Sequence, residues 1–254
     1  MKSYTLILWL ACVGLECVLV IRAWVAKWFR EYPIFLAYLA GVFVQDVVLL
    51  TVYVFKFRYY TPLYWYAEFF SLAVGCGVTW EIFRLVLGRY PGAGRMARNV
   101  LLAALLMVIS KGVLSALSGG ASWPSTAVEL ERNLRAIQAV SLIVLALLSI
   151  YYAIPIGRNV KGILSGYGLF IASCVVTLTL RASLGSQFQA AWVFIQPLCY
   201  TGVLLIWCGS LWNYAPATAP ELRPKIEEDY EALARVTRKR LIQARGYLDK
   251  SIRP

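Results

Sequence analysis

The chain contains no histidine among its 254 residues. This absence excludes haem held by imidazole, metal sites that use histidine, and Ser-His or Cys-His catalysis by this chain. Charged residues are also scarce, at 15% of the chain, whereas 60% of the residues are hydrophobic. Soluble domains are about 45–50% apolar, so the composition indicates a membrane protein.

Cysteine is present at six positions, but each of them lies inside a long apolar run. The disulfide framework of a small secreted domain is therefore not expected. The sequence contains no recognisable catalytic constellation and no cluster of metal-ligating residue types. We accordingly expect a protein that is not an enzyme and that holds neither a metal ion nor a cofactor.

Seven apolar runs are long enough to cross a bilayer, which takes about 20 residues in a helix. We place the spans near 4–26, 33–55, 62–87, 99–117, 132–154, 162–184 and 189–213. Pro33 and Pro62 stand at helix starts, where the missing N–H costs no hydrogen bond, and Pro155 follows the fifth span. The predicted fold is an all-α integral membrane protein, with a bundle of seven transmembrane helices over residues 1–214.

The distribution of basic residues predicts the orientation, because cytoplasmic loops carry an excess of lysine and arginine. Basic residues follow the odd-numbered spans, at Arg22, Lys27, Arg30, Arg84, Arg89, Arg95, Arg98, Arg158 and Lys161, and recur in the tail. The opposite side has Lys2, Lys56 and Arg58. We therefore expect the amino terminus outside, the carboxyl terminus in the cytoplasm, and a place in the plasma or inner membrane. The net charge of +12 belongs to this pattern and does not indicate nucleic-acid binding.

The tail, residues 215–254, is predicted to leave the membrane and to form an amphipathic helix over 225–250. Its apolar positions fall near one stripe at helical spacing, namely Ile226, Tyr230, Leu233, Thr237, Leu241, Ala244 and Leu248. Acids lead the segment and bases follow, as the helix dipole favours. Two interpretations stay open: a helix that is solvated or lies on the membrane surface, and a docking element for a cytoplasmic or membrane protein partner.

Polar side chains lie within the predicted spans, where a charge at the helix centre costs about 2.5–3.5 kcal/mol on insertion scales. The candidates for a ligand or ion site are Glu16, Gln45, Asp46, Glu68, Lys111, Arg135, Gln138, Arg181 and Gln196. Glu16 and Asp46 are predicted near mid-membrane, and the other charges in the outer half. One interpretation is interhelical pairing that holds the bundle together. The other is an outward-facing polar pocket, in which the bases attract an anion and the deeper acids carry a proton or cation.

Two further features concern helix packing. Gly162 and Gly166 have the small-xxx-small spacing that predicts a close contact between membrane helices. Pro197 interrupts the seventh span and predicts a kink or hinge beside Gln196.

Three functions are compatible with these features. We expect a receptor-like sensor that binds a small ligand in the outer pocket and signals through the tail helix. A first alternative is a small transporter, or a proton or ion pathway, that uses Asp46 and Glu16. A second alternative is a non-catalytic subunit of a larger membrane complex, whose charges pair with helices of another protein. The lipid bilayer is a partner in all three cases.

Overall fold

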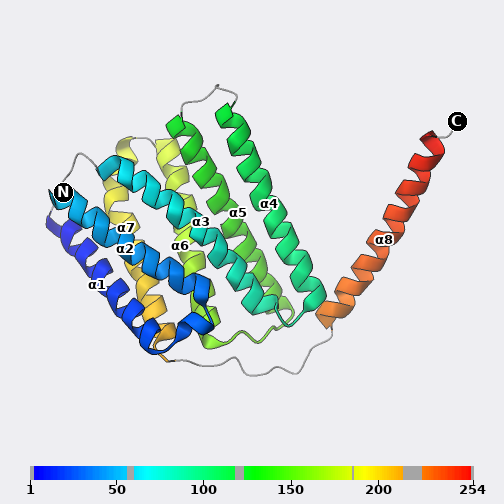
Figure 1. Ribbon diagram of the computed structural model, residues 1–254, viewed down its shortest axis with the longest axis horizontal. Coiled ribbons are helices and arrows are strands. Elements are labelled where there is room, and N and C mark those ends of the chain that lie inside the picture. Colours follow the sequence, from blue (N-terminus) through cyan, green and yellow to red (C-terminus); the bar gives the residue numbers. More distant parts are fainter. Residues whose placement is uncertain (1–2, 56–59, 118–122, 185, 214–224, 253–254) are drawn as a thin grey trace.

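Helices form the described part of the chain, which comprises residues 3–55, 60–117, 123–184, 186–213 and 225–252 of the computed structural model (Figure 1). Seven helices in these ranges are long and apolar enough to cross a membrane, and the same ranges contain no strand. The chain is therefore a multi-pass membrane protein by the length and composition of its helices.

The seven membrane-type helices are α1 (Ser3–Val25), α2 (Pro33–Phe55), α3 (Tyr60–Leu87), α4 (Pro91–Leu117), α5 (Trp123–Tyr151), α6 (Arg158–Leu184) and α7 (Ser186–Leu211). A short 3₁₀ helix, η1 (Trp28–Arg30), stands between α1 and α2, and α8 (Lys225–Ile252) comes last. Each predicted span coincides with one helix. The starts differ most for α4 and α5, which begin well before residues 99 and 132. Charged residues in their first turns lower the hydropathy without interrupting the backbone helix.

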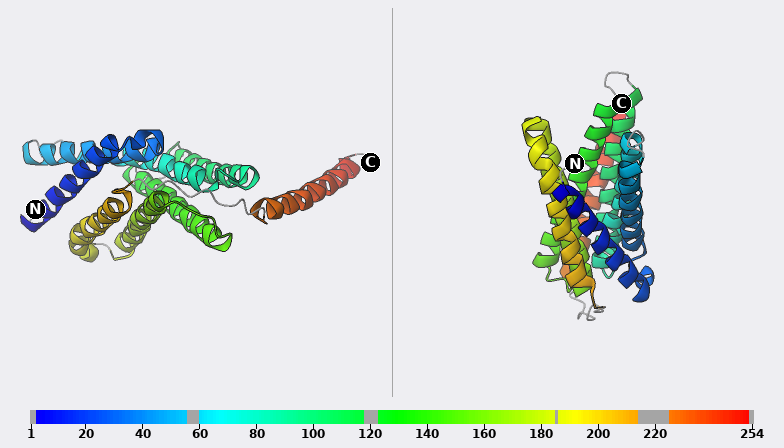
Figure 2. Two further views of the ribbon diagram at one scale, coloured as in Figure 1. Left: turned by 90° about the horizontal axis from the view of Figure 1, so that it is seen from below. Right: turned by 90° about the vertical axis from the view of Figure 1, so that its left-hand side faces the viewer.

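Six helices close into a ring in the order α1, α2, α3, α5, α6 and α7, with α7 packing back on α1. In the view from below, α2 and α3 form one row and α5, α6 and α7 form another, with α1 between the two rows at one edge (Figure 2). α4 lies outside the ring, against α3 and α5. Side chains on α4 are therefore poorly placed to reach the interior of the bundle.

The most extensive helix pair is α6 with α7, and two glycines allow their backbones to approach. A Cβ on Gly166 would lie 2.3 Å from Nε1 of Trp207, and a Cβ on Gly162 would lie 2.0 Å from Oγ of Ser210. Both distances are far below a van der Waals contact. The two glycines of the small-xxx-small spacing thus lie where α6 meets α7.

We expect Gly166→Ala to lower the free energy of unfolding by about 1–3 kcal/mol, because the new methyl group collides with a fully buried Trp207. Gly168→Ala is the matched control on the same helix, since nothing lies within 4 Å of a Cβ at that position. Unfolding of both variants in mixed micelles, followed by circular dichroism as SDS is added, measures the difference. Equal stability of the two variants would contradict this packing.

The amino terminus of α2 is held by a buried carboxylate from α3. Glu81 is 1% exposed, and its two oxygens accept hydrogen bonds from the backbone N–H groups of Ile34 (3.1 Å) and Phe35 (2.7 Å). Arg84 lies 3.3 Å from the same carboxylate. These N–H groups have no partner within their own helix, and a negative charge suits the positive end of the helix dipole. The Glu81 side chain therefore links α3 to α2 as well as pairing with Arg84.

Glu81→Ala is expected to destabilise the protein by about 1–3 kcal/mol, because two N–H groups lose their acceptor where water is excluded. Glu81→Gln retains one acceptor oxygen and should lose less. Arg84→Ala is the control: its side chain is 48% exposed, so we expect a loss below about 1 kcal/mol. The same SDS titration ranks the three variants, and a larger loss for Arg84→Ala than for Glu81→Ala would refute the capping role.

The apolar core blocks one half of the ring. Five side chains from α2, α6 and α7, here called the apolar plug, are each 2% exposed or less: Phe35, Leu39, Ile163, Leu204 and Trp207. The rings of Phe35 and Trp207 meet edge to face, with centroids 5.1 Å apart. The plug lies toward the end of the bundle at which α2 begins and α7 ends (Figure 1).

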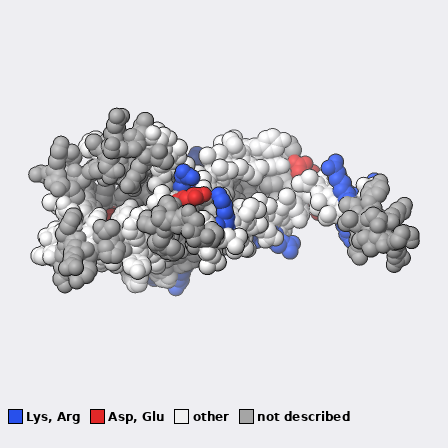
Figure 3. Space-filling model, turned by 90° about the horizontal axis from the view of Figure 1, so that it is seen from above, with Lys and Arg blue, Asp and Glu red and all other residues white. Residues whose placement is uncertain are grey.

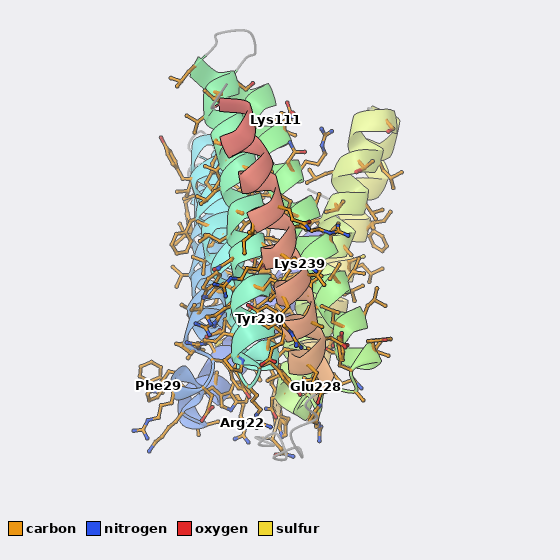
Figure 4. All side chains as sticks on the ribbon, turned by 90° about the vertical axis from the view of Figure 1, so that its right-hand side faces the viewer. Arg22, Phe29, Lys111, Glu228, Tyr230 and Lys239 are labelled. Atoms are coloured by element: carbon orange, nitrogen blue, oxygen red, sulfur yellow. The ribbon has the colours of Figure 1, made fainter. Side chains whose placement is uncertain are left out.

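α8 leaves the bundle at the end where α4 begins (Figures 1 and 4). Ile226 is buried in the core, and the Tyr152 hydroxyl donates a hydrogen bond to Oδ2 of Asp229 at 3.1 Å. Desolvation and the Asp229 carboxylate raise the pKa of Tyr152. From residue 231 to residue 243 the side chains are exposed. Among the described side chains of α8, contact with the bundle is therefore confined to the first turns, and the ribbon of the helix projects away from the bundle (Figure 1).

Candidate functional site: two polar clusters inside the bundle

The first cluster, here called the acid pair, consists of Glu16 on α1 and Asp46 on α2. Glu16 is fully buried, and Oε1 accepts a 2.5 Å hydrogen bond from the hydroxyl of Tyr200 on α7. The carboxyl groups of Glu16 and Asp46 interact electrostatically with each other between α1 and α2. No donor of the described protein reaches Oε2 of Glu16. The two acids are therefore each other's close neighbours.

The acid pair needs a proton or a cation to be satisfied. A carboxylate only accepts hydrogen bonds, so two carboxyl groups can bond to each other only when one carries a proton. No ion pair among the described residues gives Glu16 or Asp46 a basic partner. The amide oxygen of Gln45 is also buried without a donor. This part of the bundle thus has a surplus of acceptors.

α7 contacts the acid pair one turn after its internal proline. The hydroxyl of Thr201, next to Tyr200, donates to the carbonyl of Pro197 at 2.8 Å and lies 3.2 Å from Sγ of Cys12 on α1. Pro197 has no N–H, so the carbonyl one turn earlier loses its usual helical partner. The weakest point in the backbone hydrogen bonding of α7 therefore lies beside the contacts that join α7 to α1.

The second cluster, here called the ion triad, joins α3 to α5. The guanidinium of Arg135, 4% exposed, donates from Nη2 to Glu68 and from Nε to Oε1 of Glu131 at 2.9 Å. The triad carries one cation and two carboxylates. The recess beside it, lined by Trp65, Glu68, Phe69, Leu72 and Glu131, has no space for a water-sized molecule. The triad is therefore a link between α3 and α5 whose cation is already paired with two carboxylates.

An aromatic ring connects the two clusters. The guanidinium carbon of Arg135 lies 5.7 Å from the centre of the Phe170 ring on α6. The Tyr200 ring, whose hydroxyl bonds to Glu16, lies at the same centroid distance of 5.7 Å from Phe170. A cation above an aromatic face is attracted by the ring quadrupole. The position of Phe170 thus depends on both clusters.

The remaining predicted site residues occupy other positions. Gln138, fully buried on α5, donates from Nε2 to Sγ of Cys76 at 3.1 Å, and its amide oxygen has no donor among the described residues. Gln196 is half-buried on α7, four residues before Tyr200. Arg181 belongs to α6, but its side chain lies outside the described residues.

Lys111 does not join either cluster. Its side chain is 68% exposed and lies 3.2 Å from Oε1 of Glu129, because α4 stands outside the ring. Figure 4 places Lys111 toward the end of the bundle opposite Arg22 and Phe29. In the view from above, most described atoms on that face are uncharged (Figure 3). The predicted site residues whose side chains are described therefore divide into two clusters and several outlying positions, without converging on one cavity.

Three residues of these clusters were not predicted from the sequence: Glu131, Phe170 and Tyr200. Glu131 lies four residues before Arg135, a spacing at which opposite charges pair on a helix, but the predicted span began at 132 and excluded it. No local pattern indicates that Tyr200 meets Glu16, because the two are 184 residues apart in the chain. Phe170 resembles any other apolar residue of a membrane helix.

The two clusters differ in what they leave unsatisfied. Comparison with protein-family models, curated proteins and solved structures finds no match to this chain. The ion triad has its cation paired on both sides, whereas the acid pair holds surplus acceptors in the interior of the bundle.

Proposed function

We propose that this protein is a receptor-like membrane sensor whose ligand is the proton, taken up by the acid pair. The observation that carries the proposal is the fully buried Glu16, which faces Asp46 without a basic partner among the described residues. A buried carboxyl in the membrane is stable only when it is paired or protonated. The proton is also the smallest ligand, and it needs no cavity.

The proposed orientation has the amino terminus outside and the tail helix in the cytoplasm. The ends of α1 and α3 and the start of α6 lie at one end of the bundle (Figure 1), and they carry Arg22, Arg84 and Arg158. The positive-inside rule supports the assignment of that end to the cytoplasm. The acid pair then faces the outer half of the membrane, and the apolar plug separates it from the cytoplasm.

Coupling to the cytoplasm would run along α1 and α7. Near the membrane centre these helices share the Glu16–Tyr200 hydrogen bond, and at the lower end Arg22 donates from Nε (3.0 Å) and Nη2 (2.8 Å) to the carbonyl of Trp212. Loss or gain of the shared proton changes what Tyr200 can donate to. Movement of α7 below Pro197 would then alter the chain that leads to α8, the proposed docking element for a protein partner.

The apolar plug favours a sensor over a carrier. A proton or ion pathway needs polar groups or water on both sides of the site. The five side chains of the apolar plug, which lie below the acid pair, are each 2% exposed or less. The pathway remains the second candidate because Tyr60, at the outer start of α3, interacts electrostatically with Asp46.

The two candidates are separated by one set of proteoliposome measurements on the full chain. Spin labels on α8 and on the start of α4 report their distance as the outer pH is changed, and a pH-sensitive dye reports proton flux. For a sensor we expect a pH-dependent distance that Asp46→Asn abolishes, with no flux. Glu129→Gln, which removes an exposed carboxyl, is the control and should behave as wild type. If the spin-label distance does not change with pH, the sensor proposal is wrong. If wild type conducts protons and Asp46→Asn does not, the protein is a proton pathway.

A further inference from the structure

An open groove of about 560 Å³ lies between α5 and α6. Small residues form its floor, and among them are Ala139 and Ala146 on α5 and Gly168 and Ala172 on α6. The hydroxyl of Ser165, which also lines the groove, donates to the carbonyl of Gly162 on its own helix. The volume of the groove falls in the range of small-molecule sites, roughly 300–1,000 Å³. The groove thus presents an apolar surface with space for a ligand.

The length of the groove matches one leaflet of a bilayer. It runs along α6 from Lys161 to Ala172, which is about 16 Å at 1.5 Å per residue. The hydrocarbon core of a bilayer is about 30 Å thick, so the groove extends from one membrane surface to the middle. A transmembrane helix of another protein would need a groove that continues through both leaflets. An acyl chain of one leaflet has the required length.

A positive charge lies at the end of the groove nearest the membrane surface. Lys161 lines that end, near the start of α6, and its side chain is exposed. None of the ion pairs between described residues involves Lys161. Basic pockets between transmembrane helices on the cytoplasmic side bind anionic lipid headgroups. Charge and shape therefore indicate the same class of ligand.

We propose that the groove between α5 and α6 is a binding site for an anionic phospholipid, with one acyl chain along the small residues and the phosphate on Lys161. The site is separate from the acid pair and does not depend on the proposed sensor function. Gly168 gives direct access to it, because nothing lies within 4 Å of a Cβ there. A larger side chain at this position fills the groove without displacing its neighbours.

The test uses the full chain reconstituted in vesicles of equal parts phosphatidylglycerol and phosphatidylcholine. After gentle extraction, native mass spectrometry counts the lipids that each variant retains. Wild type is expected to keep one phosphatidylglycerol in preference to phosphatidylcholine. Lys161→Gln should weaken this preference about fivefold, the effect of one basic residue at an anionic surface. Gly168→Leu should abolish retention of either lipid.

Two matched variants complete the design. Gly202→Leu on α7 adds the same side chain at a position with nothing within 4 Å, and Lys111→Gln removes an exposed lysine at the opposite end of the bundle. Both should retain lipid as wild type does. Lys161 is exposed, so its substitution tests the site even if Gly168→Leu fails to fold. Equal retention by wild type, Lys161→Gln and Gly168→Leu overturns the proposal. The proposal is also overturned if wild type is a dimer and Gly168→Leu is a monomer, because the groove is then occupied by a second copy of the chain.

Discussion

Arg135→Leu is expected to destabilise the protein by about 3–5 kcal/mol, a larger loss than we expect for Glu81→Ala or Gly166→Ala. The substitution leaves Glu68 and Glu131, whose side chains are only 18% and 12% exposed, without their cation. Removing one partner of a buried ion pair is far more destabilising than the pair itself is stabilising, because an uncompensated charge stays behind. SDS titration in mixed micelles measures the loss. Stability should partly return as the pH is lowered, because both carboxyl groups can then be protonated.

Two control variants test whether the loss in Arg135→Leu comes from the buried ion triad. Lys111→Leu breaks the ion pair with Glu129 on the exposed face of α4, and surface pairs contribute only about 0–1 kcal/mol. The triple variant Glu68→Gln, Glu131→Gln and Arg135→Leu removes all three charges, so it should be more stable than Arg135→Leu alone. A similar loss for Lys111→Leu and Arg135→Leu would show that the ion triad has no special weight in the fold.

The second large effect concerns pH and the acid pair. In the proposed function Glu16 and Asp46 share a proton in the folded bundle. They would then hold one more proton than the same groups do when separated in water at neutral pH. Wherever the folded state binds more protons than the unfolded state, stability falls as the pH rises, by up to about 1.4 kcal/mol per pH unit for one proton. We therefore expect wild type to lose stability from neutral to alkaline pH. Glu16→Gln and Asp46→Asn should each flatten this dependence, because two like charges no longer meet.

Other titratable groups face the acid pair and must be controlled. They are Cys12 on the same helix as Glu16, Tyr60 and Glu68 on α3, and Tyr200 on α7. Cys12→Ser and Tyr200→Phe preserve the shape of the site and remove two of these four groups, one at a time. Infrared difference spectra give an independent measure, because a protonated carboxyl has its own carbonyl band. If this band persists unchanged in both Glu16→Gln and Asp46→Asn, the shared proton does not reside on the acid pair.

The two clusters have opposite roles in the proposed function. The cation of the ion triad is paired with both carboxylates, so the triad holds α3 against α5 and places Arg135 over Phe170. The acid pair has too few hydrogen-bond donors, since Oε2 of Glu16 has none among the described residues. In the proposed function a change in its protonation changes the acceptor available to the Tyr200 hydroxyl. In this proposal the ion triad keeps α3 and α5 fixed relative to each other, and the acid pair allows α1 and α7 to respond to pH.

The helices were largely predictable because they follow from local chemistry. A run of about 20 apolar residues must form a helix in lipid, where backbone groups can bond only within the segment. The predicted span at 33–55 and the helix Pro33–Phe55 have the same bounds, since a proline stands at the start. The predicted start at 132 missed the true start of α5, because hydropathy locates the hydrocarbon layer and not the end of a helix.

The polar candidates could also be predicted from the sequence, since an ionisable residue within a span is recognisable whatever direction its side chain takes. Which of them lie together could not be predicted. Lys111 and Arg135 look alike in a hydropathy profile, yet one is 68% exposed and the other is buried, because α4 lies outside the ring and α5 is part of it.

By itself, the sequence determined that the chain crosses a membrane, which residues carry charge inside it, and where two glycines permit close packing. The tertiary structure alone decided which helices are neighbours, and hence that Glu16 meets Asp46 and Tyr200 while Arg135 is taken by Glu68 and Glu131. The physical reason is the distance along the chain over which each interaction acts. Insertion into lipid depends on each segment separately, whereas the partner of a buried charge depends on side chains that arrive from other helices, far away along the chain.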